Sequence, residues 1–385
     1  MKIAVVNETI GDERRVALVP EVIKTLAGKG HQVSVEAEAG AGARIPDAAF
    51  EAAGARIADR GSSLDDAHIV VRVSPPTVED IRQLPHGGAL IGFLEPLTSP
   101  DTTLALASAG VTAFAMEAIP RISRAQSMDA LSSQASVAGY RAALMAAQEM
   151  GRFFPMLTTA AGTIPPAKVL VLGAGVAGLQ AIATARRLGA QVTAFDVRAV
   201  VREQVESLGA KFLELGVGAD AEASGGYARA LSDDEQKRQQ DALGEAVSAF
   251  DVLITTALIP GRPAPKLIPE AGVRNMRAGA VIVDLAGEAG GNTELTVPGQ
   301  TATIDGVTIV SPLNLPSQMA EHASYLYARN VAALLDLLTA EDGALAPDFD
   351  DEIVATACIT RGGAILHPGA RAAAEAVHET ELRAA

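Results

Sequence analysis

The sequence is poor in cysteine and in aromatic residues. Its 385 residues include one cysteine, no tryptophan and only 3% aromatic side chains. Cys358 has no second cysteine with which to form an internal disulfide, so nothing indicates an oxidising compartment. Glycine or charge interrupts each apolar stretch before the roughly 20 residues that a membrane helix needs. Because no basic and apolar leader precedes MKIAVVNE, we expect a cytoplasmic chain that spans no membrane.

Positive charge is scarce as well. The 31 lysines and arginines stand against 46 aspartates and glutamates, which gives a formal charge of −15. This charge repels phosphate backbones and no basic cluster offsets it, so we expect no nucleic-acid partner. The histidines are scattered, none lies in a recognisable catalytic motif, and we expect no metal site; they are His31, His68, His86, His322, His367 and His378.

Short β-rich runs alternate with helical segments along most of the chain. KIAVV, HQVSVE, HIVVRV, ALIGFL and VTAFAME predict one parallel sheet, and VLVLGAG, AQVTAFDV, KFLEL, DVLITTA and AVIVDLA predict five parallel strands of a second. We therefore expect an α/β protein with two doubly wound, Rossmann-like parallel-sheet domains joined by long helices. Residues 1–135 and 320–385 should form a discontinuous first domain, and residues 136–319 the second. The Ala-rich stretch from about 135 to 155 is predicted to be a linking helix.

A dinucleotide fingerprint follows the strand KVLVL. Gly173, Gly175 and Gly178 form GAGVAG at the start of a predicted helix, where they permit a tight turn, backbone approach to a pyrophosphate and close helix packing. Asp196 ends the next strand, where an acidic residue binds the ribose hydroxyls. A 2′-phosphate beside it would meet about 4 kcal/mol of repulsion at about 4 Å, which favours NAD over NADP. Arg198 weakens this preference in the alternative of a promiscuous site.

The stretch PRISRAQSMDALSSQ, residues 120–134, is dense in hydrogen-bonding side chains. Arg121, Gln126, Asp129 and Ser132 offer the donors and acceptors that orient a carboxamide. Two interpretations remain open: a loop that grips a nicotinamide, and a helix cap with solvated charges.

A long polar, Gly- and Ala-rich segment covers residues 216–240. It is longer than connections in such domains normally are, so we interpret it as a lid. The alternative is a surface excursion without a role.

The scattered histidines bear on the type of reaction. An enzyme that oxidises an alcohol or an amine moves a proton as well as a hydride, and places a titratable side chain beside the reacting carbon. Transfer between two nicotinamides moves hydride alone. Because side chains far apart in sequence can converge in space, the histidine pattern by itself leaves both reactions open.

RISRAQSMD and the following AAGTIPPAKVLVLGAGVAGLQAIATARRLGA resemble the NAD-binding domain I of proton-translocating nicotinamide nucleotide transhydrogenase. The resemblance runs essentially end to end and includes ERRVALVPE, SGGYAR, ITTALIPGRPAP, VIVDLAGEAGGN and TRGGAILHP. It implies that Arg121, Gln126 and Asp129 position the nicotinamide with Ser132 close by, and that Tyr227 lies on a mobile loop that closes over NAD(H). The cofactor contacts that it implies are Arg121, Ile122, Ser123, Gln126, Ser127, Met128, Asp129, Gly173, Gly175, Val176, Gly178, Asp196, Val197, Arg198, Gly226, Gln239 and Leu258.

The resemblance also implies partners. In that family domain I works as a homodimer docked on an NADP-binding domain, which is coupled to a membrane domain that conducts protons. For this chain it implies a split α subunit, with NADP(H) as co-substrate on a β subunit and with a separate membrane-spanning subunit that attaches the chain peripherally to the inner membrane.

Alanine dehydrogenase, similar in fold to domain I, is the first alternative. Where that enzyme carries a catalytic histidine this sequence has Glu95, and a substrate-binding lysine is replaced by Ser74. Its substrate-binding arginine is retained as Arg15, which we expect to serve structure or a surface ion pair. The second alternative is an NAD-sensing module, which needs the fingerprint but has no use for a nicotinamide-gripping loop.

Overall fold

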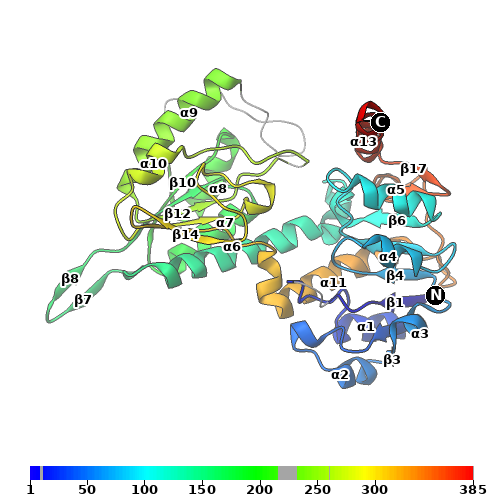
Figure 1. Ribbon diagram of the computed structural model, residues 1–385. Helices are drawn as coiled ribbons and strands as arrows, with labels where there is room; N and C mark the ends of the chain where they lie inside the picture. Colours follow the sequence, from blue (N-terminus) through cyan, green and yellow to red (C-terminus); the bar gives the residue numbers. More distant parts are fainter. Residues whose placement is uncertain (9–11, 216–231, 260, 385) are drawn as a thin grey trace. The chain divides into compact units, whose positions relative to one another are not determined.

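The chain folds into two compact units in the computed structural model (Figure 1). The structure describes residues 1–8, 12–215, 232–259 and 261–384. Met1–Gln134 and Ser317–Ala385 form the first unit, and Ala135–Pro316 forms the second. Each unit contains one large, mainly parallel sheet with helices, so the expected α/β, Rossmann-like fold class is confirmed.

The first unit contains an eight-stranded sheet in the order β17-β16-β6-β5-β4-β1-β2-β3. Its strands are β1 (Lys2–Val5), β2 (Gln32–Glu36), β3 (Arg56–Ala58), β4 (Ile69–Val71), β5 (Ala89–Gly92), β6 (Thr112–Ala115), β16 (Cys358–Arg361) and β17 (Ala364–Ile365). Strands β1 to β6 are parallel. The expectation of a purely parallel sheet was wrong at one edge, where β16 runs antiparallel to β6 and β17 antiparallel to β16.

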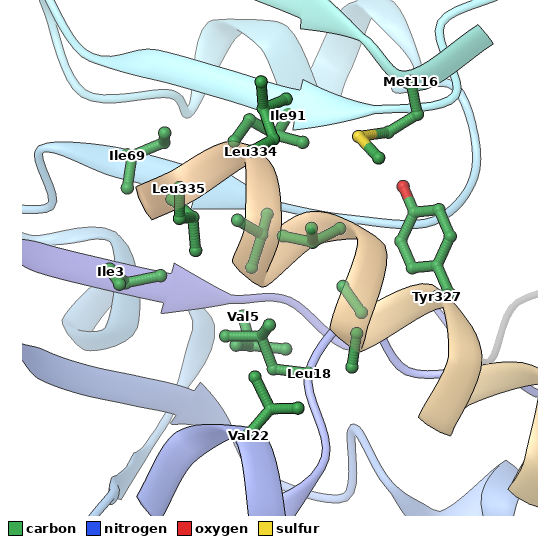
Figure 2. Packing of buried hydrophobic residues seen from close by; sticks show 14 of the residues in the cluster. Ile3, Val5, Leu18, Val22, Ile69, Ile91, Met116, Tyr327, Leu334 and Leu335 are labelled. Carbon is green, nitrogen blue, oxygen red and sulfur yellow. The ribbon is translucent and has the colours of Figure 1, made fainter. Parts of the chain in front are cut away.

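Helix α11 (Ala320–Leu337) supplies much of the core of the first unit. Tyr327, Leu334 and Leu335 recur at helical spacing and are fully buried with residues of β1, β4 and β5, as Figure 2 shows. The other α-helices described in this unit are α1 (Pro20–Gly28), α2 (Asp47–Ala52), α3 (Arg60–Leu64), α4 (Val78–Arg82), α5 (Pro100–Ser108), α12 (Glu352–Ala357) and α13 (Pro368–Ala384).

The second unit contains a seven-stranded sheet in the order β11-β10-β9-β12-β13-β15-β14. The five expected strands are present and parallel: β9 (Lys168–Leu172), β10 (Gln191–Phe195), β11 (Lys211–Phe212), β12 (Val252–Thr255) and β13 (Val281–Asp284). Two further strands, β14 (Thr301–Ile304) and β15 (Val307–Val310), form an antiparallel hairpin that we did not expect. Its Asp305–Gly306 turn has positive φ at both residues, the arrangement that an Asp-Gly pair favours.

Helix α6 (Ala130–Glu149) begins five residues before the linking helix that we expected. The other α-helices described in this unit are α7 (Val176–Arg187), α8 (Arg202–Ser207), α9 (Asp233–Ala246) and α10 (Glu270–Arg274). Helix α9 takes in the last part of the segment that we interpreted as a lid, because Ser232 and Glu235 form a capping box at its start.

A small hairpin of β7 (Leu157–Thr159) and β8 (Gly162–Ile164) extends away from the strands of the second sheet (Figure 1). Its three-residue strands are largely exposed, so they carry no buried apolar alternation that the sequence could reveal. None of the described helices combines the length and the apolar character that a bilayer crossing requires.

Candidate dinucleotide-binding site

The fingerprint glycines make the turn between β9 and α7. Gly173 has a φ of +95°, and a Cβ there would lie 2.6 Å from Thr256 Oγ1. A Cβ on Gly178 would lie 1.8 Å from the Gly173 carbonyl oxygen, so both positions require glycine. A Cβ on Gly175 would meet nothing within 4 Å, and no side chain caps α7 there. The open backbone face and the helix N-terminus fit a pyrophosphate.

Asp196 follows β10 and faces this turn. Its Oδ2 accepts a hydrogen bond from the Ala174 backbone N–H at 2.7 Å, and its Oδ1 accepts one from the Arg198 N–H at 2.9 Å. The Arg198 guanidinium donates to both carboxylate oxygens, from Nε at 2.9 Å and from Nη2 at 2.8 Å. The structure thus places the Asp196 carboxylate at the fingerprint turn and pairs it with Arg198. Val197, between them, is half-buried.

Two exposed apolar side chains lie at the same carboxyl edge of the sheet. Val176, 41% exposed, is the first residue of α7, and Leu258, 49% exposed, follows β12, which pairs with β9. Thr256 ties the segment after β12 to the turn: its N–H donates to the Leu172 carbonyl at 2.9 Å and its Oγ1 to the Gly173 carbonyl at 3.1 Å. Exposed apolar groups beside a phosphate-binding turn suit a flat, partly apolar ligand.

The resemblance implied three further site residues in the second unit: Gln239, Gly226 and Tyr227. Gln239 lies within α9 and is buried, so its side chain is not presented to solvent. Gly226 and Tyr227, with most of the segment interpreted as a lid, lie outside the described residues.

In the first unit, the polar loop expected to orient a nicotinamide contains a 3-10 helix, η3 (Ser123–Met128). Ala125 and Met128 are buried in the core and anchor it. Asp129 then caps α6, since its carboxylate accepts hydrogen bonds from the Ser132 N–H at 2.9 Å and the Ser132 hydroxyl at 2.6 Å. The helix cap that we considered as an alternative is therefore present at these two residues.

The same loop presents other polar groups outward. Arg121, Ser123, Gln126 and Ser127 are exposed or half-exposed, whereas Ile122 packs against the core. Exposed side chains on an anchored backbone can bind a ligand with little ordering cost.

Arg15 lies in a buried ionic cluster of the first unit. Its guanidinium donates to Glu13 from Nε at 2.9 Å and from Nη2 at 2.7 Å, and Nη1 donates to Gln134 Oε1 at 2.9 Å. The Ser74 hydroxyl donates to the same Glu13 at 3.0 Å. Arg15 is 7% exposed, so the surface ion pair that we considered was wrong and the structural role holds.

Glu117, which sequence reasoning missed, lies just after β6 in this unit. Its Oε1 accepts hydrogen bonds from the backbone N–H groups of Leu94 and Glu95. Its Oε2 has no hydrogen-bond partner among the described residues, and burial raises the pKa of this carboxyl to about 7. The signal in the sequence was an acidic residue at the end of the apolar strand VTAFAME. Glu95 itself is exposed, with its carboxylate near the Ser99 hydroxyl.

Comparisons with known proteins cover nearly the whole chain. Residues 4–138 match the family described as alanine dehydrogenase/PNT, N-terminal domain, and residues 142–368 match the corresponding C-terminal domain. An NAD(P) transhydrogenase subunit alpha component of Rhodospirillum rubrum is 49% identical over 380 residues, which cover 96% of this chain and 98% of the relative.

Two solved structures give the same TM-score of 0.83. The transhydrogenase of Sinorhizobium meliloti is 43% identical and covers 96% of this chain and 99% of its own. An L-alanine dehydrogenase is 26% identical and covers 98% of this chain and 100% of its own. The chain therefore belongs to the alanine dehydrogenase/PNT family and is a homologue of transhydrogenase subunit alpha.

Proposed function

We propose that this chain is the NAD(H)-binding component of a proton-translocating transhydrogenase, and that it passes hydride between NADH and an NADP+ held on a partner subunit. The observation that carries the proposal is the strand, GAGVAG turn and helix of the second unit, with the Asp196 carboxylate at that turn. The name that the relatives share, NAD(P) transhydrogenase subunit alpha, supports the reaction type.

In this proposal the second unit selects NAD(H) over NADP(H). Bound there, the pyrophosphate would lie against the N-terminus of α7 and the adenosine ribose against Asp196, while Val176 and Leu258 supply apolar contact. A 2′-phosphate beside Asp196 would meet about 4 kcal/mol of repulsion per charge pair at about 4 Å. Arg198 offsets part of that repulsion while it remains paired with the carboxylate.

In this proposal the side chains of the chain act by positioning the nicotinamide ring. The dihydronicotinamide supplies the hydride, and reducing NADP+ needs no proton from a side chain. Arg121 and Gln126 orient the carboxamide from the loop that Asp129 joins to α6, and Ser132 fixes Asp129. Tyr227 is proposed to close over the site.

We propose the partners that the resemblance implies. The chain forms a homodimer, docks on a β subunit that holds NADP(H), and is attached to the inner membrane through a separate membrane-spanning subunit. Proton translocation belongs to that assembly.

Alanine dehydrogenase activity is the second candidate, because the fold matches that enzyme and Arg15 is retained. The chemistry of the site favours the transhydrogenase component over this enzyme. Arg15 is engaged by Glu13 and Gln134, and Glu95 and Ser74 stand where the resemblance places a catalytic histidine and a substrate-binding lysine. An NAD-sensing module is the third candidate, and the exposed polar loop at Arg121 and Gln126 argues against it.

The test uses purified protein with and without the β subunit. We expect NADH binding by fluorescence titration, no oxidation of alanine with NAD+, and hydride exchange between NADH and an NADP+ analogue only when the β subunit is added. Alanine oxidation would establish the dehydrogenase instead. NADH binding with no exchange in the presence of the β subunit would favour the sensor.

A further inference from the structure

A buried carboxylate organises the segment after β13. Asp284, the last residue of that strand, is fully buried. Its Oδ1 accepts hydrogen bonds from Thr255 Oγ1 at 2.9 Å and from the Ala286 N–H at 3.0 Å. Its Oδ2 accepts them from the Asn292 N–H at 2.7 Å and from Thr296 Oγ1 at 2.6 Å. Because both oxygens are saturated, the backbone position of Asn292 is fixed.

Asn292 in turn holds the segment after β12. Its side chain is fully buried, and its Oδ1 accepts a hydrogen bond from the Ala257 N–H at 3.0 Å. Its Nδ2 donates to the Ala257 carbonyl at 2.8 Å and to the Pro265 carbonyl at 2.9 Å. One amide thus satisfies both backbone groups of Ala257, as a neighbouring strand would, and holds together the two ends of the connection that carries Leu258.

The residue before Ala257 is tied to the fingerprint turn. Thr256 Oγ1 donates to the Gly173 carbonyl at 3.1 Å, and the Thr256 N–H donates to the Leu172 carbonyl at 2.9 Å. Leu258 directly follows Ala257, so the segment that leads into it is held by the turn through Thr256 and by Asn292 through Ala257. Leu258 is 49% exposed and follows β12, which pairs with β9, the strand that leads into the fingerprint turn.

We propose that Asn292 is a positioning residue for the dinucleotide site: through Ala257 it fixes Leu258 beside the fingerprint turn, where the leucine side chain covers bound NAD(H). This inference rests on the proposed function. A hydrogen-bonded amide suits the task because Nδ2 and Oδ1 match the carbonyl and the N–H of one residue, which a carboxylate of the same shape does not.

The first test needs no cofactor. Asn292→Asp keeps the shape but places an acceptor against the Ala257 and Pro265 carbonyls. We expect amide hydrogen exchange around Leu258 to become about 100-fold faster while β12 stays protected. Asn275→Asp, at an exposed asparagine after α10, is the matched control. It should change neither the exchange rate around Leu258 nor that of β12. Unchanged exchange around Leu258 in Asn292→Asp would overturn the proposal.

The second test is a double-mutant cycle on NADH affinity. Asn292→Asp and Leu258→Ala should each weaken NADH binding about 10-fold, and the double variant should lose little more than either single variant, because both remove the same contact. Leu258→Ala leaves the Asn292 hydrogen bonds intact, so it remains informative if Asn292→Asp folds poorly. Fully additive losses, or a Leu258→Ala variant with wild-type affinity, would overturn the positioning role. A wild-type chain that binds no NADH would instead defeat the proposed function.

Discussion

Arg198 grips Asp196 with two hydrogen bonds, one to each carboxylate oxygen, at 2.9 and 2.8 Å. The residue that should select NAD(H) is therefore paired with the cation best suited to a 2′-phosphate, because a guanidinium binds phosphate as readily as carboxylate. While it is paired with Asp196, the Arg198 guanidinium is less available to bind a phosphate. Its positive charge also weakens the negative electrostatic potential around the carboxylate. If the second unit binds the dinucleotide as we propose, its cofactor selectivity should depend on this balance.

Asp196→Asn should shift selectivity toward NADP(H). The change removes the negative charge and releases Arg198, so we expect the NADPH to NADH affinity ratio to rise at least about 10-fold. Fluorescence titrations with both reduced cofactors measure the ratio. Asp241→Asn, at an exposed aspartate of α9, is the matched control and should leave it unchanged. A constant ratio in Asp196→Asn would mean that another residue selects the cofactor.

Gln126→Ala should impair catalysis more than binding. Gln126 is exposed on η3 while the buried Ala125 and Met128 keep the loop in place, so its loss removes orientation without unfolding the loop. We expect hydride transfer in the reconstituted complex to slow about 100-fold and NADH affinity to change less than about 3-fold. Stopped-flow kinetics and NADH titration give the two values. Gln83→Ala, at an exposed glutamine after α4, should alter neither, and equal losses of rate and affinity in Gln126→Ala would contradict an orienting role.

The features that the sequence predicted are those with a local physical signal. Buried parallel strands appear as continuous apolar runs, and the GAGVAG turn is sterically specified because a Cβ on Gly178 would overlap the Gly173 carbonyl. The five expected strands of the second sheet and the position of Asp196 directly after β10 follow from such signals.

What the sequence did not reveal depends on long-range contacts or on weak local patterns. The Asp305–Gly306 turn between alternating runs was a hairpin signal that we overlooked. Strand β16 joins the sheet only through β6, about 240 residues away. Asn292 is indistinguishable in sequence from a loop asparagine, because its role depends on Ala257 and Pro265, which are distant along the chain.

Gly139→Ala should destabilise the second unit. A Cβ at Gly139 in α6 would lie 2.0 Å from the Ala177 carbonyl oxygen in the first turn of α7, so the two helices would have to separate. We expect a loss of about 1–3 kcal/mol in the free energy of unfolding, measured by urea denaturation. Gly151→Ala is the control, since a Cβ there meets nothing within 4 Å, and it should be neutral or slightly stabilising. Wild-type stability in Gly139→Ala would show that the helices adjust without cost.

The buried Glu117 should make the first unit less stable as pH rises. Burial raises the pKa of this carboxyl from 4.5 to about 7, so between these values the folded chain holds a proton that the unfolded chain has released. The contribution of this carboxyl to stability is therefore greatest below pH 4.5, falls as the pH rises toward 7 and is level above it. The shift corresponds to a contribution of about 3 kcal/mol across that window.

Glu117→Gln should remove this contribution. The glutamine oxygen can still accept the Leu94 and Glu95 N–H groups, and its amide replaces the protonated oxygen, so the variant resembles the acid form at every pH. We expect wild-type and variant urea-denaturation stabilities to agree at about pH 4, where the carboxyl is protonated in both the folded and the unfolded chain, and the variant to be more stable at about pH 8. Glu79→Gln, at an exposed glutamate of α4, should follow the wild-type curve. Parallel pH curves for wild type and Glu117→Gln would mean that this carboxyl ionises as it does in water, because only a pKa that differs between the folded and unfolded chain can change the slope.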